Sequence, residues 1–230
     1  NTDFIDNSAG VDCSDNEVNI KIPLNREMRE GRLVETKRNT LLAKMTDEVS
    51  ELVLEDNRLQ SLALSIAEAG GARALPGHVR TIEILEASGR LDRKVEGLAS
   101  SEELSRRAQE GRGLTRPELA VVLSMSKITL QDAAVKLHLA DEKLLEEQLF
   151  DAFPKPMRKA HADAIRHHRL RHEIVATKVA NRFVNRLGPG LAFDLIEEEG
   201  AALKQVVAAF LVTERLLDLD KLWEEIEQAS

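Results

Sequence analysis

The 230-residue chain contains no tyrosine, one tryptophan and one cysteine, and aromatic residues make up only 3% of it. So few aromatic side chains leave almost no platforms on which nucleic-acid bases stack. They are also atypical of a β-sandwich or β-barrel, whose strands are rich in aromatic and β-branched residues. The single cysteine excludes an internal disulfide and a zinc site built from several cysteines, which fits a reducing compartment, so we expect a cytoplasmic protein.

Long apolar runs and an excess of basic residues are also missing. No stretch of about 18 consecutive apolar residues is present, so the sequence predicts no membrane-spanning helix. No basic segment precedes an apolar one at the start, so we expect no secretory signal. The formal net charge is −8, whereas a nucleic-acid-binding protein needs a basic face. We therefore expect neither a membrane nor a nucleic acid as a partner.

The abundant residues, Ala, Leu, Glu, Lys and Arg, are strong helix formers, and the sequence predicts a mostly α-helical chain. The sharpest predicted helix start is at Thr115, which can act as the cap, with Pro117 in the first turn and Glu118 completing a capping box. The most amphipathic stretch covers residues 171–187 and is followed by a Gly-Pro-Gly sequence that predicts its end.

Polar residues predict several breaks between helices. Thr46 and Asp47 are typical of a helix start, and Asp56 with Asn57 is typical of an interruption, so we expect separate helices on either side of each pair. Near the C-terminus we expect Asp220 to cap a last helix. Three apolar residues of that helix are predicted to face the core: Leu222, Trp223 and Ile226.

The first 22 residues have a different character. Phe4 and Ile5 suggest the end of a strand, and the small polar residues at 6–10 are typical of a tight turn. Ser14 followed by Glu17 has the spacing of a capping box. We therefore predict a strand end, a loop and a helix start, a junction whose backbone N–H groups suit an anion. The alternative is an ordinary connection that binds nothing.

Few side chains suggest chemistry by their spacing. His168 and His172 are four residues apart and would share one helix face, as two metal ligands often do. Arg169 and Arg171 oppose a cation there by like charge, so we predict no metal. Cys13 has no histidine close to it in sequence, and we expect a small buried side chain rather than a nucleophile. No catalytic residue is identified.

Five segments occur in a particular order along the chain: DNSAGVDCSDNEVNIKI at 6–22, RNTLLAKMTDEV at 38–49, LVLEDNRLQ at 52–60, LTRPELAVVLSMSKI at 114–128 and HEIVATKVANRFVNRLG at 172–188. Together they resemble the large, long-subunit class of bacterial NAD-dependent glutamate dehydrogenases. The chain is similar to the C-terminal part of such an enzyme, and because it does not begin with methionine we expect a fragment.

The resemblance implies two parts of unequal size. Residues 1–24 are expected to be a short remnant of an α/β, Rossmann-like catalytic domain. Residues 25–230 are expected to form a multi-helix C-terminal domain. The polar stretch that contains Pro23 and Gly31 suggests the boundary between them.

The resemblance also implies ligand contacts. Smaller glutamate dehydrogenases carry a related stretch, N-A-G-G-V-x-x-S, whose asparagine lies near the nicotinamide and whose valine and serine contact glutamate. The matching positions are Asn7 on the NAD side and Val11 and Ser14 on the substrate side. This chain has Ala9 where the smaller enzymes have the first of two glycines, which changes the expected path of the loop. The catalytic lysine and aspartate and the dinucleotide fingerprint are expected upstream of Asn1.

The implied reaction is the oxidative deamination of L-glutamate to 2-oxoglutarate and ammonium, with NAD as the hydride acceptor. By resemblance the whole enzyme is expected to be a homo-oligomer, and this chain alone is expected to be inactive. An alternative function is open: the helical part is a non-catalytic oligomerisation or protein-interaction module.

Overall fold

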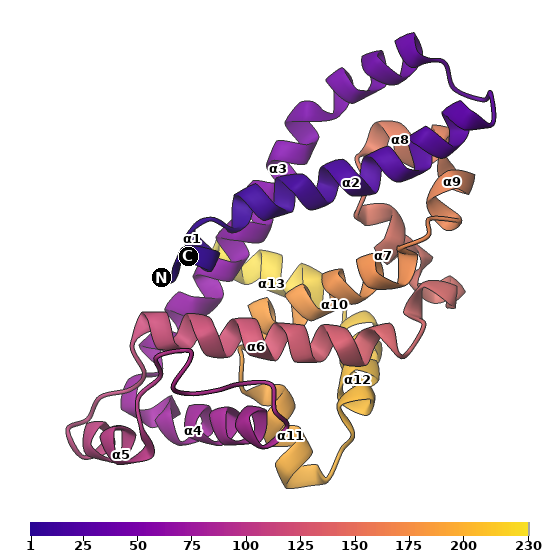
Figure 1. The fold of residues 1–230 in the computed structure, drawn as a ribbon. Helices are drawn as coiled ribbons and strands as arrows, with labels where there is room; N and C mark the ends of the chain where they lie inside the picture. The colour runs from indigo at the N-terminus through magenta and orange to yellow at the C-terminus, as the bar shows by residue number, and fades with distance from the viewer. Residues whose placement is uncertain (230) are drawn as a thin grey trace.

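The computed structural model describes residues 1–229, and every regular element within them is a helix (Figure 1). The chain begins with α1 (Asp3–Asp6), α2 (Ser8–Arg29) and α3 (Glu35–Ala69). α2 and α3 run antiparallel as a long hairpin (Figure 1). The prediction of a mostly α-helical chain is confirmed.

The remaining helices follow in order. The middle of the chain forms α4 (Gly71–Ala87), α5 (Ser101–Gln109) and α6 (Arg116–Val135). The later part forms two 3-10 helices, η1 (Leu139–Asp141) and η2 (Lys143–Leu145), and then α7 (Glu146–Asp151), α8 (Lys155–Ala160), α9 (Ala162–Arg166), α10 (Arg171–Leu187), α11 (Leu191–Glu199), α12 (Leu203–Leu216) and α13 (Leu219–Gln228).

The centre of the molecule is the contact between α6 and α10, which lie side by side in Figure 1. α10 has the predicted bounds, and its apolar face is buried as expected, with Val175, Val179 and Phe183 at 0%, 1% and 1% exposure. The start of α6 is also as predicted: Glu118 accepts hydrogen bonds from the backbone N–H and the hydroxyl of Thr115, each at 2.8 Å. The buried faces of these two helices form the middle of a hydrophobic core to which most of the other helices also contribute.

The predicted strand end, loop and capped start in the first 22 residues are wrong. Phe4 and Ile5 lie in α1, and Ser14 lies inside α2, where its hydroxyl donates to Gly10 O (3.1 Å) instead of capping a helix. Ile20 and Leu24 are buried, so α2 has an apolar face that packs against the core. Tertiary packing therefore outweighs the turn preference of the local sequence.

Pro23 was expected at a boundary but lies inside α2, where it has no N–H to donate to the carbonyl of Asn19 one turn earlier. The imidazole of His168 takes that place, with Nε2 3.2 Å from Asn19 O. The backbone N–H of Leu170 donates to Nδ1 of the same ring at 3.0 Å, which leaves the ring proton on Nε2. Burial lowers the pKa of His168, so the ring is a neutral donor that completes the helix.

The breaks predicted within residues 33–69 are also wrong, because α3 is one continuous helix of 35 residues. Asn57 stays helical because its side-chain amide donates to Val53 O at 2.9 Å. The hydroxyl of Thr46 lies 3.4 Å from Leu42 O, one turn earlier. These polar side chains satisfy their hydrogen bonds within the helix, while the buried side chains of Met45 and Leu64 pack α3 against the core.

α13 differs from its prediction in its cap and in two of the three residues expected to face the core. Its first turn follows Asp218 rather than Asp220, and Leu222 and Ile226 are 47% and 56% exposed instead of facing the core. Charged contacts hold this helix: Glu227 pairs with Arg186 and with Arg58, the latter at 2.7 Å. Trp223 is partly buried against the core as predicted, and electrostatic contacts take the place of the apolar packing expected of Leu222 and Ile226.

Arg182 connects this helix to α12. Its Nη2 lies 2.6 Å from Asp220 Oδ2 and 2.6 Å from Glu214 Oε1. Glu214 is only 5% exposed, and burial raises its pKa to about 7, with the negative charge of Asp220 adding to the rise and Arg182 opposing it. A carboxyl group that is partly protonated near neutral pH thus lies under the C-terminal helix.

We predict that His168 and Pro23 are energetically coupled. His168→Phe keeps a ring beside Phe153, whose centroid is 5.8 Å away, but leaves Asn19 O without a donor, and we expect it to cost about 2 kcal/mol of unfolding free energy. Pro23→Ala restores an N–H for Asn19 O, so in the double variant at least about 1 kcal/mol should return. Urea unfolding of the four proteins measures this cycle. Strictly additive effects would show that the two residues act independently.

We predict that Glu214 makes the folded state lose stability as pH rises. Because its pKa is about 7 when folded and 4.5 in the reference state, the folded chain binds the extra proton between these values. The stabilisation is complete below pH 4.5 and is lost through pH 7, by up to about 3 kcal/mol. Comparing the pH dependence of wild type and Glu214→Gln by urea unfolding isolates this contribution. Identical profiles for both proteins would contradict it.

Candidate functional site

The three residues predicted to contact ligands, Asn7, Val11 and Ser14, lie on one exposed face of the first helical segment. Asn7 joins α1 to α2, and the other two follow at positions i+4 and i+7, which share a helix face. Val11 is 60% exposed. An amide, an apolar side chain and a hydroxyl are therefore presented together to the outside, although their roles toward NAD and substrate stay predictions.

Cys13 lies on the same helix but is exposed, so the expectation of a buried side chain is wrong. The reason is the register of α2. Its buried positions in this region are Ile20 and Leu24, and Cys13 lies seven residues before the first of them, where the helix no longer has core beneath it.

The adjoining face of α2 forms a polar seam with α3. Ser8 Oγ lies 2.6 Å from Asn57 Oδ1 and accepts a hydrogen bond from Gln60 Nε2 at 3.2 Å. Asn57 Nδ2 in turn lies 3.4 Å from Asp12 Oδ2. This seam fixes the rotation of α2 about its axis, so it decides that Val11 and Ser14 face outward.

A charged cluster continues the seam toward α6 and α10. Lys178 Nζ lies 3.1 Å from Asp56 Oδ2. Burial raises the pKa of Asp12, with the nearby Asp56 carboxylate adding to the rise. Burial lowers the pKa of Lys127, against the attraction of the same two carboxylates. Shifted acids and bases of this kind are common at functional sites, but they also occur in structural ion-pair networks.

A cavity of about 200 Å³ adjoins this cluster and is lined by Asp12, Asp56, Lys178 and Asn181, among others. Asn181 Oδ1 is buried and has no hydrogen-bond partner among the described residues. The sequence contains no signal for this cluster, because Asp12 and Lys178 are far apart in the chain and come together through the packing of both α2 and α10 on α3.

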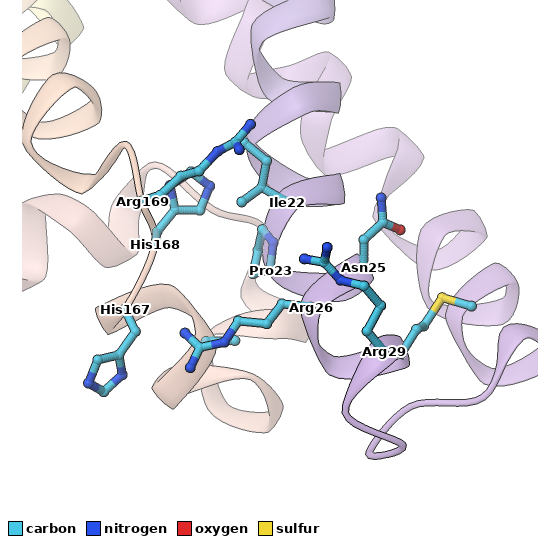
Figure 2. A pocket seen from close by; sticks show the side chains of 10 residues that line it. Ile22, Pro23, Asn25, Arg26, Arg29, His167, His168 and Arg169 are labelled. Atoms are coloured by element: carbon cyan, nitrogen blue, oxygen red, sulfur yellow. The ribbon is translucent and has the colours of Figure 1, made fainter.

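A second cavity, of about 640 Å³, lies between α2 and the segment around α9 and is rich in guanidinium groups (Figure 2). Arg26, Arg29 and Arg169 line it, with Pro23 and Ile22 contributing apolar surface. Arg26 also donates to Glu30 at 3.1 Å, which neutralises part of the charge. Guanidinium groups in a cavity are suited to a carboxylate or a phosphate.

The described residues do not form a dinucleotide cradle. Within residues 1–229 there is no strand that leads through a glycine-rich turn into a helix, which is the arrangement that holds a pyrophosphate. The one residue with a predicted role toward NAD is Asn7. No chemical step through the cofactor follows from this part of the chain.

The histidines considered as a metal pair do not meet. Both ring nitrogens of His168 are engaged with the backbone, as described above, and its ring packs beside Phe153. His172 instead faces Asp141, with Nε2 3.7 Å from Oδ1. The separation arises because α10 begins at Arg171, so that His168 lies in the preceding turn rather than on the same helix face.

Comparisons with known proteins agree with the resemblance. Residues 111–230 match the family model for the C-terminal region of glutamate dehydrogenase. Residues 1–67 match the model for the catalytic domain of bacterial NAD-glutamate dehydrogenase, a match that extends through α2 and most of α3. The boundary near residue 24 stays a prediction.

Three curated relatives are named NAD-specific glutamate dehydrogenase. The protein of Pseudomonas aeruginosa is 43% identical over 227 residues and that of Halomonas elongata 42% identical over 227 residues, each covering 99% of this chain. The protein of Mycobacterium tuberculosis is 37% identical over 230 residues, covering 100% of it. The chain spans only 14% of the length of each of these relatives.

Proposed function

The chain belongs to the bacterial NAD-dependent glutamate dehydrogenase family, and we propose that it forms part of an enzyme that converts L-glutamate, NAD and water to 2-oxoglutarate, ammonium and NADH. The observation that supports this most strongly is the identity with enzymes of that name along the whole chain. The proposed location of the reaction is the cytoplasm, which agrees with the single cysteine. Among the described residues, none of the helices is both long and apolar enough to cross a membrane.

In this proposal the exposed face of α2 is the contribution of the chain to the active site. The hydroxyl of Ser14 would turn away from Gly10 O to donate to a substrate carboxylate, and Val11 would pack against the aliphatic part of glutamate. Asn7 would lie on the cofactor side. The support is that these three side chains share one accessible face, so that one bound ligand can contact all of them.

The helices beyond the first segment supply a scaffold in this proposal. The seam formed by Ser8, Asn57 and Gln60 holds the exposed face of α2 outward. Asp12 on this helix and Lys127 on α6 carry opposite charges that attract each other across the cluster. The helical part thus acts on the reaction by positioning, and the chain alone lacks the groups that transfer the hydride and the proton.

The proposal is tested in the full-length enzyme. We expect Ser14→Ala to lower kcat/KM for glutamate about tenfold, the loss of one hydrogen bond to a charged group, with little change in KM for NAD. The matched control is Ser50→Ala, an exposed serine on α3, which should leave both constants unchanged. The isolated 230-residue chain should show no glutamate-dependent NAD reduction. Turnover by that chain, or an unaffected Ser14→Ala enzyme, would refute the assignment.

A second candidate function, homo-oligomerisation, is supported by the apolar surface of α12. A groove of about 590 Å³ runs between α12 and the 3-10 helices and is lined by Leu139, Leu145, Leu211, Val212 and Leu216, among others. Val212 and Leu216 are 65% and 78% exposed. Apolar side chains gathered on one surface are typical of a protein contact.

This function has its own test. Sedimentation of the 230-residue chain should give a concentration-dependent mass, and Leu216→Lys should shift it toward the monomer. The control is Leu54→Lys, an equally apolar residue that is 67% exposed on α3. A monomer at every concentration would remove the support for this surface as a self-association site and would leave the catalytic proposal untouched.

A further inference from the structure

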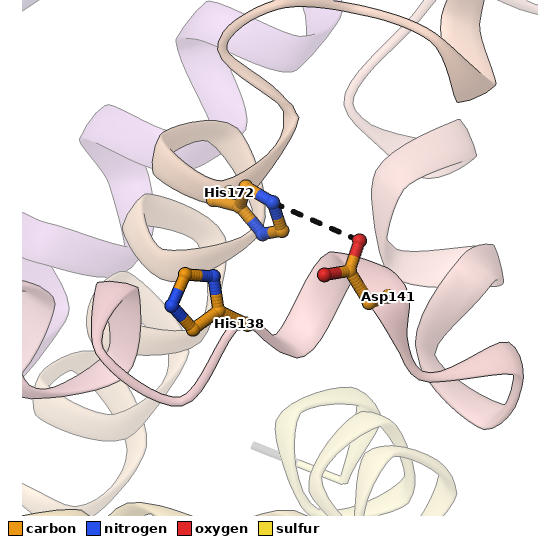
Figure 3. Close-up of side chains that lie close together, drawn as sticks. All are labelled: His138, Asp141 and His172. Atoms are coloured by element: carbon orange, nitrogen blue, oxygen red, sulfur yellow. Dashed lines mark ion pairs between the residues drawn. The ribbon is translucent and has the colours of Figure 1, made fainter.

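Three side chains with metal-ligand chemistry converge beside the start of α10 (Figure 3). They are His138, Asp141 and His172, and one ligand atom from each lies within 4.8 Å of the others. The rings of His138 and His172 are 5.0 Å apart at 85°. His172 Nε2 is 3.7 Å from Asp141 Oδ1. This group was not predicted from the sequence, because His138 and His172 are far apart in the chain.

The backbone around His138 is shaped for this convergence. α6 ends at Val135, and His138 adopts φ 50° and ψ 40°, a left-handed conformation that non-glycine residues rarely take. This conformation turns the chain directly into η1, and the buried side chain of Leu139 anchors the turn in the core. The turn brings His138 and Asp141 to the same side, opposite His172 in the first turn of α10.

The imidazoles of His138 and His172 contact each other, and His172 approaches Asp141, but neither ring has a hydrogen-bond partner among the described residues. Of the ring nitrogens, His172 Nδ1 is buried without a partner among these residues. The neighbouring histidines 161, 167 and 168 are all hydrogen-bonded through a ring nitrogen. A buried polar atom without a partner is uncommon and requires an explanation.

We propose that His138, Asp141 and His172 bind one divalent transition-metal ion of the Zn²⁺ class. Two imidazoles and a carboxylate are borderline donors that favour Zn²⁺, Co²⁺ or Ni²⁺ over Mg²⁺ and Ca²⁺, which prefer oxygen ligands. Zinc–ligand distances of about 2 Å place ligand atoms roughly 3.3 Å apart in a tetrahedron. His138 and Asp141 are exposed, so their side chains can rotate by the small amount needed, and a fourth position stays open to water.

Arg171 competes with a metal ion for the carboxylate of Asp141. Its Nη2 lies 3.0 Å from Asp141 Oδ1, and its positive charge opposes that of a metal ion. The metal-free carboxylate is therefore held by a guanidinium group that must yield when a metal binds. This competition separates a metal site from a simple cluster of ion pairs, because removing Arg171 should strengthen metal binding.

The test is titration of the 230-residue chain with Zn²⁺ by calorimetry, and with Co²⁺ by visible absorption. We expect one ion per chain, no binding of Mg²⁺, and loss of binding in His138→Ala and in Asp141→Asn. Both substitutions change exposed residues, so circular dichroism should show an intact fold. His167→Ala, another exposed histidine in this part of the chain, is the matched control and should bind like wild type.

Arg171→Ala should tighten the binding of Zn²⁺ by several fold. Failure to bind one ion per chain would overturn the proposal, as would binding that survives both His138→Ala and Asp141→Asn. Weaker binding in Arg171→Ala would also overturn it, since that result would assign the ion to a different set of groups.

Discussion

The contact between His168 and the carbonyl of Asn19 is the constraint on which the N-terminal half of the fold depends. Pro23 has no N–H to donate to this carbonyl, so α2 lacks one of its backbone hydrogen bonds. The neutral, buried imidazole of His168, in the segment before α10, supplies the missing donor, with Nε2 3.2 Å from Asn19 O. α2 can therefore continue to Arg29 and pair with α3 along its length, but only while the later helices are folded against it.

This dependence links the exposed face of α2 to the core of the molecule. Asn7, Val11 and Ser14 face outward because the polar seam through Ser8 and Asn57 fixes the rotation of the helix. The helix in turn is held by His168, which α10 and its neighbours position. A change in the packing of the later helices is thus transmitted to the surface that we propose to contact the substrate, through the backbone of a single helix.

The elements predicted correctly from the sequence are those whose start, end and apolar face are determined by residues within or next to the element itself. α10 has a complete apolar face and a glycine stop, and α6 begins at the Thr115 and Glu118 capping pair. The sequence failed at Pro23, because its compensating donor lies 149 residues from Asn19 in the chain. The cluster of Asp12, Lys127 and Lys178 was missed for the same reason, while Asn7, Val11 and Ser14 came from family resemblance rather than from physical pattern.

The continuity of α2 is the central claim, because the sequence alone suggests a loop before Ser14 and a boundary near Pro23 instead of one helix. Amide hydrogen exchange over residues 12–29 tests it most directly. The structure predicts protection on both sides of Pro23, with the amides of 12–19 and of 24–29 exchanging much more slowly than an unstructured chain. Exchange of the amides of 12–19 at the rate of an unstructured chain, with protection only beyond Pro23, would contradict the account.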